Sequence, residues 1–111
     1  MRATLTTHVL DAARGVPGAG ISVGLFALAG GERTLLHVAV TNADGRTDAP
    51  LATELAPGPY ELVFAVADYF ARDGVATFFD EIPVRFVIGD GARYHVPLLL
   101  SPWSYSTYRG S

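Results

Sequence analysis

Residues 57–66 read Pro-Gly-Pro-Tyr-Glu-Leu-Val-Phe-Ala-Val and combine a chain break with a strictly alternating apolar run. Tyr60, Leu62, Phe64 and Val66 occupy every second position, which places them on one face of a β-strand. The proline and glycine residues before them end whatever element precedes. This stretch therefore predicts a strand with one buried face that begins sharply after a turn.

The same pattern recurs on both sides of this stretch, with turns rich in Gly, Pro and Asp between the runs. Further strands are predicted at residues 4–10, 94–100 and 104–108. Three more are predicted from alternating residues that face the core, and these residues are Ile21, Val23, Leu25 and Ala27 in the first, Leu36, Val38 and Val40 in the second, and Ile82, Val84, Phe86 and Ile88 in the third. In the second of these strands His37 is expected to face outward. One helix is expected over residues 68–73, capped by Asp68 and stopped by Gly74. Seven to eight short strands with one short helix indicate an all-β sandwich.

At 111 residues the chain is close to the commonest domain size, so we expect residues 1–111 to form a single domain around one core. Half of the residues are hydrophobic and only 17% are charged, against about a quarter in typical domains. Such a composition predicts that the domain buries more surface than its own core. Because obligate interfaces resemble a core cut in half, we expect the chain to form oligomers.

Charge and composition exclude several classes of function. The net charge is −3 and the eight basic residues are scattered, which argues against nucleic acid as a partner. The longest apolar run, Val96 to Leu100, is far too short to cross a bilayer, so no membrane partner is expected. The chain has no cysteine, which removes disulfides and thiolate nucleophiles. With no apolar run at its start, the chain is expected to be cytoplasmic.

Four places carry side chains suited to chemistry: His8, Arg46, His95 and the final Tyr-Arg-Gly-Ser. Each has an ordinary structural interpretation, because a histidine on a strand and an arginine after an Asp-Gly turn are most often surface residues. A chain end is usually poorly ordered as well. Here the last segment is rich in aromatic and β-branched residues and ends with Arg109, Gly110 and Ser111. This composition indicates that the terminus packs against the rest of the domain.

Taken together, these places match a family pattern. The segments Leu5-Thr-Thr-His-Val-Leu-Asp11, Thr41-Asn-Ala-Asp-Gly-Arg46, Tyr94-His-Val-Pro-Leu-Leu-Leu-Ser-Pro102 and Tyr105-Ser-Thr-Tyr-Arg-Gly-Ser111 resemble the 5-hydroxyisourate hydrolase family, the transthyretin-related family of urate breakdown. The terminal Tyr-Arg-Gly-Ser is the most specific part. The resemblance implies a transthyretin-like (prealbumin-like) β-sandwich that assembles as a homotetramer, a dimer of dimers, with active sites where dimers meet.

The resemblance also implies a reaction. Water opens the six-membered ring of 5-hydroxyisourate to give 2-oxo-4-hydroxy-4-carboxy-5-ureidoimidazoline, with no cofactor expected. His8 and His95 are the expected catalytic pair, since imidazole exchanges protons near neutral pH. Arg46 is expected to assist catalysis by stabilising the developing anion and, with His8, to bind the substrate. The sequence leaves open which histidine is the general base.

The chain end is expected to complete the site. Tyr108 and Ser111 offer hydroxyls that bind substrate or water. Arg109 and Gly110 are expected to anchor the tail, with Gly110 allowing a tight turn into the cleft.

Two alternatives to the hydrolase stay open at this point. One is a purely structural prealbumin-like sandwich that serves as an interaction module. A transthyretin-type carrier of small aromatic ligands would share the fold without catalysis, although paired histidines and an arginine do not suit an apolar channel. A catalytic metal is not expected, because the three histidines lack zinc-ligand spacing, and only adventitious zinc between His8 and His95 is left open. The serines near the C-terminus lack a G-x-S-x-G elbow, which favours direct attack by water over an acyl-enzyme.

Overall fold

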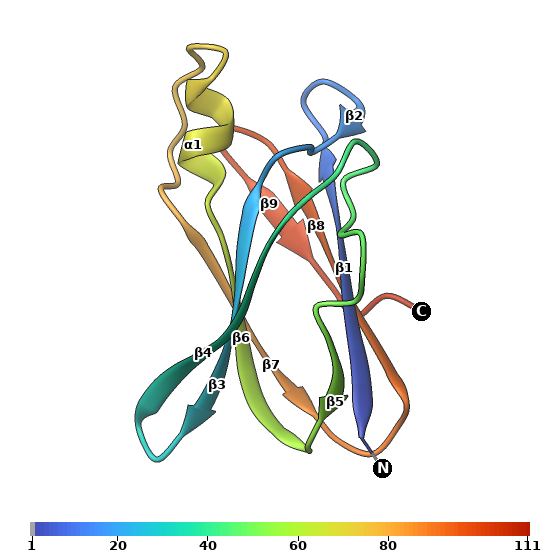
Figure 1. Cartoon of the computed structure of the whole chain (residues 1–111). Helices are drawn as coiled ribbons and strands as arrows, with labels where there is room; N and C mark the ends of the chain where they lie inside the picture. Colours follow the sequence, from blue (N-terminus) through green and yellow to red (C-terminus); the bar gives the residue numbers. More distant parts are fainter. Residues whose placement is uncertain (1) are drawn as a thin grey trace.

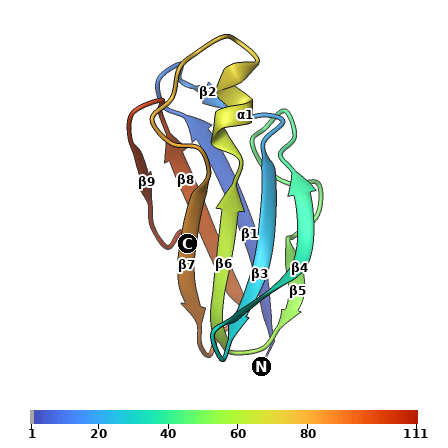
Figure 2. The ribbon, with the colours of Figure 1, turned by 90° about the vertical axis from the view of Figure 1, so that its left-hand side faces the viewer.

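The computed structural model describes residues 2–111, which form two β-sheets packed face to face with a short helix at one end (Figure 1). In chain order the elements are β1 (Ala3–Asp11), β2 (Val16–Pro17), β3 (Ser22–Ala29), β4 (Glu32–Val40), β5 (Ala52–Leu55), β6 (Gly58–Phe64), α1 (Val66–Ala71), β7 (Ile82–Ile88), β8 (Arg93–Leu100) and β9 (Tyr105–Thr107). One sheet has the order β2-β1-β8-β9 with β5 also paired to β1, and the other runs β4-β3-β6-β7 (Figure 2). The predicted all-β sandwich is confirmed, and it contains two short strands, β2 and β5, that the sequence pattern did not place.

The core fills the space between the two sheets. β1, β3 and β7 alternate buried and less buried positions, as the apolar spacing predicted for β3 and β7. β6 is buried at every position from Tyr60 to Phe64, so both of its faces are covered rather than the one face predicted. The largest fully buried side chains come from both sheets and include Leu5, Leu25, Leu62, Phe64, Ile82 and Leu98. The inward faces are therefore used for packing, and functional side chains are left to the outer faces.

The pairing of β1 with β8 is parallel and joins the two ends of the chain. Thr6 stands opposite His95, and His8 stands opposite Pro97. The hydroxyl of Thr7, which is buried, donates to the carbonyl of Val96 at 2.7 Å and ties the two strands together from the inner side. This register brings motifs 89 residues apart in sequence into contact.

The helix begins earlier than predicted, and the strand before it ends earlier. β6 ends at Phe64, and fully buried Val66 is the first residue of α1 rather than the last of a strand. Asp68 lies in the first turn and is not the cap; the N-cap is Ala65, with no side-chain hydrogen bond. The N–H of Ala67 instead donates to the carbonyl of Asp80 at 3.0 Å, so a backbone group from another segment satisfies one of the free N–H groups of the first turn.

A buried hydrogen bond fastens α1 to the end of β1. The hydroxyl of Tyr69 donates to Asp11 Oδ2 at 2.7 Å, and both residues are buried. The N–H of Arg14 donates to the other carboxylate oxygen of Asp11 at 3.1 Å. Burial, together with the hydrogen bond and charge of Asp11, raises the pKa of Tyr69 to about 12.

The inward face predicted for β4 is wrong. Leu36, Val38 and Val40 are about half exposed, at 46%, 51% and 59%. β4 is one of the two edge strands of its sheet and pairs with β3, and the register slips where Leu25 and Phe26 face it. Since a one-residue slip reverses which side chains face the core, alternation alone could not assign this face.

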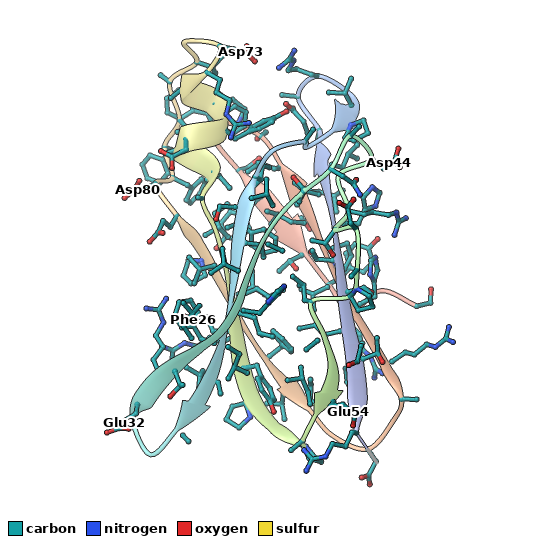
Figure 3. The ribbon with its side chains drawn as sticks, in the orientation of Figure 1. Phe26, Glu32, Asp44, Glu54, Asp73 and Asp80 are labelled. Carbon is teal, nitrogen blue, oxygen red and sulfur yellow. The ribbon has the colours of Figure 1, made fainter. Side chains whose placement is uncertain are left out.

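The outer face of the second sheet carries an ion-pair ladder. Glu61, nearly fully buried, accepts from Arg33 Nε at 2.7 Å and from Arg85 Nε at 2.9 Å. Burial alone would raise the pKa of Glu61, but hydrogen bonds and charge from the two arginines outweigh it and hold the pKa below its usual value. Arg33 also lies over the ring of Phe26, which Figure 3 labels on this face.

Candidate active site

The site predicted from the sequence lies on the outer face of the first sheet. Along β1, Thr4, Thr6 and His8 are half-buried and alternate with buried side chains that enter the core. His95 alternates outward in the same way between buried Tyr94 and Val96 on β8. Because the two strands are neighbours, this alternation puts both predicted histidines on one face.

A tight turn brings Arg46 to this face. Asn42 Oδ1 accepts from the N–H groups of Asp44 at 2.9 Å and Arg46 at 3.2 Å, forming a side-chain-stabilised turn. Gly45 has φ +73° and its carbonyl accepts from the N–H of Val9 at 2.8 Å. A side chain at Gly45 would collide with the Val9 carbonyl, so glycine allows the turn to dock on β1. Figure 3 labels Asp44 in this turn, next to β1.

The C-terminal tail follows the free edge of β8. β9 pairs antiparallel with β8, with Thr107 opposite Leu98, and the same register resumes where Gly110 faces His95. Between these points Pro97 lies opposite Tyr108, and proline has no N–H to donate to the tail. The strand is therefore interrupted and then rejoined by the N–H of Gly110, which donates to the carbonyl of His95 at 2.8 Å. Figure 1 shows the C-terminus emerging beside β1.

Gly110 is suited to this position for a different reason from the one expected. It is not among the described glycines with positive φ, so a tight left-handed turn does not require it. A Cβ at this position would lie 2.5 Å from His95 Cδ2 and 3.3 Å from Cγ. Glycine therefore lets the tail backbone lie directly against the imidazole ring.

These segments enclose a cavity of about 470 Å³. Its lining comes from β1, the Arg46 turn, β8 and the chain end, and consists of Thr4, Thr6, Arg46, Arg93, Tyr94, His95 and Ser111. Three predicted site residues, Arg46, His95 and Ser111, thus meet in one cavity. His8 is not part of this lining, but it lies near enough to act on the charge state of His95.

The surroundings of His95 favour its neutral form. Burial is the main cause that holds the pKa of His95 below its usual value, followed by the positive charge of Arg46 and the electrostatic effect of His8. A neutral imidazole near neutral pH has a lone pair that can accept a proton. Nδ1 of His95 is already engaged by a hydrogen bond with Thr6 Oγ1 at 2.8 Å.

Tyr108 and Arg109 belong to the tail but do not line the cavity that contains Arg46 and Ser111. They line a second cavity of about 330 Å³ between β7 and β8, which also touches His95. The Arg109 guanidinium stands 4.4 Å from the ring centroid of Tyr94 and reaches the carbonyl of Arg93 at 3.4 Å. Tyr108, 59% exposed, does not line the cavity that holds Arg46 and Ser111, so the substrate-binding role predicted for it stays a prediction.

Sequence reasoning missed Thr6. A hydroxyl two residues from His8 on a strand shares its face, and that spacing was the available signal. Its partner, His95, could not be identified without the pairing of β1 with β8. Across residues 2–111, no three His, Asp or Glu side chains converge in a way that could hold a metal ion.

Comparison with known proteins places the chain in a family. The HIUase/Transthyretin family matches residues 5–110. The chain belongs to this family. A 5-hydroxyisourate hydrolase of Deinococcus radiodurans is 56% identical over 113 residues, which cover 96% of this chain and 95% of that relative.

Solved structures of the HIUase/Transthyretin family share the fold. Klebsiella pneumoniae 5-hydroxyisourate hydrolase has a TM-score of 0.87 and 39% identity, covering 98% of this chain and 99% of that one. Sea bream transthyretin in complex with thyroxine has a TM-score of 0.90 and 29% identity, covering 97% of this chain and 95% of that one. The transthyretin-like sandwich predicted from the sequence is thus confirmed.

Proposed function

We propose that this protein is a 5-hydroxyisourate hydrolase. The observation that carries the proposal is the cavity in which Arg46, His95 and Ser111 converge from three separate segments, beside His8. Relatives that cover nearly the whole chain at about half identity bear the name 5-hydroxyisourate hydrolase, which supports the same conclusion. We take residues 1–111 as the hydrolase domain.

The proposed reaction is direct hydrolysis of a ring amide. Water forms a bond to the ring carbonyl carbon, the bond from that carbon to the ring nitrogen breaks, and the nitrogen leaves with a proton. His95 is suited to take the proton of water, because its surroundings keep the imidazole neutral. The proton that His95 has taken is then given to the leaving nitrogen, and His8 is left to orient water or the leaving group.

Arg46 supplies the positive charge that this reaction needs. As water adds, negative charge develops on the carbonyl oxygen, and a guanidinium held in the cavity can stabilise it. The turn that docks on β1 fixes the backbone of Arg46, so that its side chain starts from a set position beside the cavity. Ser111 also lines the cavity and offers its hydroxyl or terminal carboxylate, while Arg109 and Gly110 hold the tail.

Assembly as a homotetramer of two dimers is part of this proposal. Phe78, Val87 and Trp103 are 72%, 71% and 66% exposed, and association that covered these apolar side chains would be favourable. Sedimentation equilibrium of the purified chain tests the proposed assembly, since a monomer at working concentration would contradict the tetramer.

Within residues 2–111, no helix has the length and apolar character needed to cross a membrane. The cytoplasmic location stays a prediction.

The carrier alternative is not favoured. A thyroxine complex is known for the sea bream transthyretin with the same fold. The cavity in this chain is lined by Arg46, Arg93, His95 and hydroxyl groups, which suit a polar, planar substrate better than a large apolar one.

Decay of freshly generated 5-hydroxyisourate, followed by ultraviolet absorbance, tests the proposed function. We expect strong acceleration by the protein and loss of most of it in His8→Ala, Arg46→Ala and His95→Ala. His37→Ala is the matched control, because His37 is an exposed histidine on the edge strand β4. A folded protein that leaves the spontaneous rate unchanged would overturn the hydrolase assignment.

A further inference from the structure

Among residues 2–111, the side chain that forms a hydrogen bond with a ring nitrogen of His95, the proposed base, is Thr6. Thr6 Oγ1 lies 2.8 Å from Nδ1, and the two residues are direct neighbours in the parallel register of β1 and β8. The bond is part-buried, so water competes with it only partly. Two strands in the middle of a sheet hold both partners.

The other edge of the imidazole faces the tail. The backbone of Gly110 approaches the edge formed by Cγ and Cδ2 so closely that a side chain there would not fit. With Nδ1 bound to Thr6 and this edge against the tail, Nε2 is the nitrogen left free to work on a substrate or water. Thr6 and Gly110 therefore hold the ring from two sides.

We propose that Thr6 is a positioning residue for His95: its hydroxyl accepts a hydrogen bond from Nδ1–H, so that Nε2 carries the lone pair used in the reaction. The catalytic meaning of this arrangement rests on the proposed hydrolase function. The arrangement also resolves the choice between the two histidines, because it assigns the role of general base to His95.

Proton transfer explains the direction of the hydrogen bond. A neutral imidazole has one N–H, and a hydroxyl can either donate or accept. If Thr6 donated to Nδ1, the ring proton would sit on Nε2 and no lone pair would be available there. If Thr6 accepts from Nδ1–H, Nε2 takes a proton from water and the Nδ1–H bond to Thr6 stays in place throughout.

The choice of a hydroxyl over a carboxylate also matters. A carboxylate beside Nδ1 would favour the imidazolium and raise the pKa of the ring. The neutral hydroxyl of Thr6 orients the ring without adding charge, and burial, Arg46 and His8 keep the pKa of His95 low. Thr6 thus positions His95 while leaving it neutral.

Nitrogen NMR of ¹⁵N-labelled histidine in the whole protein tests this directly, since it distinguishes the two neutral tautomers. We expect His95 of the wild-type protein to be protonated on Nδ1, with its signals assigned through His95→Gln. A wild-type His95 protonated on Nε2 would overturn the proposal without any change at Thr6.

Two substitutions separate positioning from structure. Thr6→Val keeps the shape and removes the hydroxyl, so we expect a mixture of tautomers and a fall in kcat of about 10-fold with little change in KM. Thr6→Ser restores the hydroxyl and should recover both readouts. Thr34→Val makes the same change on the other sheet, at an exposed position of β4, and should alter neither.

The outcomes distinguish this proposal from the hydrolase assignment. A Thr6→Val protein with wild-type tautomer and turnover, or a Thr6→Ser protein that behaves like Thr6→Val, would overturn the role of Thr6. An inactive wild-type protein whose His95 tautomer still depends on Thr6 would support the positioning and overturn only the proposed function.

Discussion

Replacing Gly110 by alanine should damage the site through a single methyl group. The added Cβ would lie 2.5 Å from His95 Cδ2, 3.3 Å from Cγ and 3.4 Å from Cβ. Carbon atoms in contact normally stay about 3.5–4.0 Å apart, so either the ring or the tail must move by about 1 Å. Both movements change the relation between His95 and Ser111, which share one cavity.

The expected loss follows from that displacement. A misplacement of about 1 Å in a catalytic arrangement costs about 100-fold in rate, which is about 2.7 kcal/mol of transition-state stabilisation. The fold should be little affected, because the tail contributes one hydrogen bond here, between Gly110 N–H and the His95 carbonyl. Such a bond is worth about 0.5–1.5 kcal/mol.

Kinetics of 5-hydroxyisourate decay and thermal unfolding by circular dichroism together check this prediction. Gly89→Ala is the matched control: it has no positive φ, and its new Cβ would meet the Tyr94 hydroxyl at an ordinary 3.7 Å. We expect normal kcat/KM for the control and about a 100-fold loss for Gly110→Ala. A Gly110→Ala protein within about twofold of wild-type kcat/KM would refute the contact between tail and ring.

Two other predictions concern charge and stability. In Arg46→Gln, loss of the arginine charge raises the pKa of the His95 imidazole, while burial and His8 still act on it. The imidazole then becomes protonated at a higher pH than in the wild type. We therefore expect the acid limb of the kcat/KM profile to move to higher pH, within about pH 5–8. A limb that stays in place or moves down would contradict this effect. In Tyr69→Phe, buried Asp11 loses its hydroxyl partner, and urea unfolding should show a loss of about 1–3 kcal/mol with unchanged kcat/KM. An unchanged unfolding midpoint would show that the bond adds nothing.

Local pattern was a sound guide where a strand pairs with its neighbours without a slip in register. β3 and β6 lie inside their sheet, and their alternating apolar residues are buried as predicted. β4 has the same kind of alternation, but it is an edge strand with a slip in register, and Val38 and Val40 are exposed. β7 is also an edge strand, yet its alternating residues face the core as predicted, so the slip in register is what separates β4 from the other strands.

The predicted start of the helix was wrong for a related reason. Asp68 is a good capping residue by type, yet the N–H of Ala67 finds the carbonyl of Asp80 instead. A partner 13 positions away that belongs to a different segment is invisible to a local rule. With the carbonyl of Asp80 in place as a partner, the helix begins at Val66, two residues before the predicted start at Asp68.

The sequence by itself determined which side chains share a face, because successive Cβ atoms of a strand point to opposite sides of the sheet. It also supplied the motifs that identify the family, including His8, Arg46, His95 and the chain end. Only the tertiary structure decided that Thr6 meets His95 and that Tyr108 and Ser111 lie in different cavities. These contacts depend on the register between strands far apart in the chain, and that register is set by the packing of the whole core.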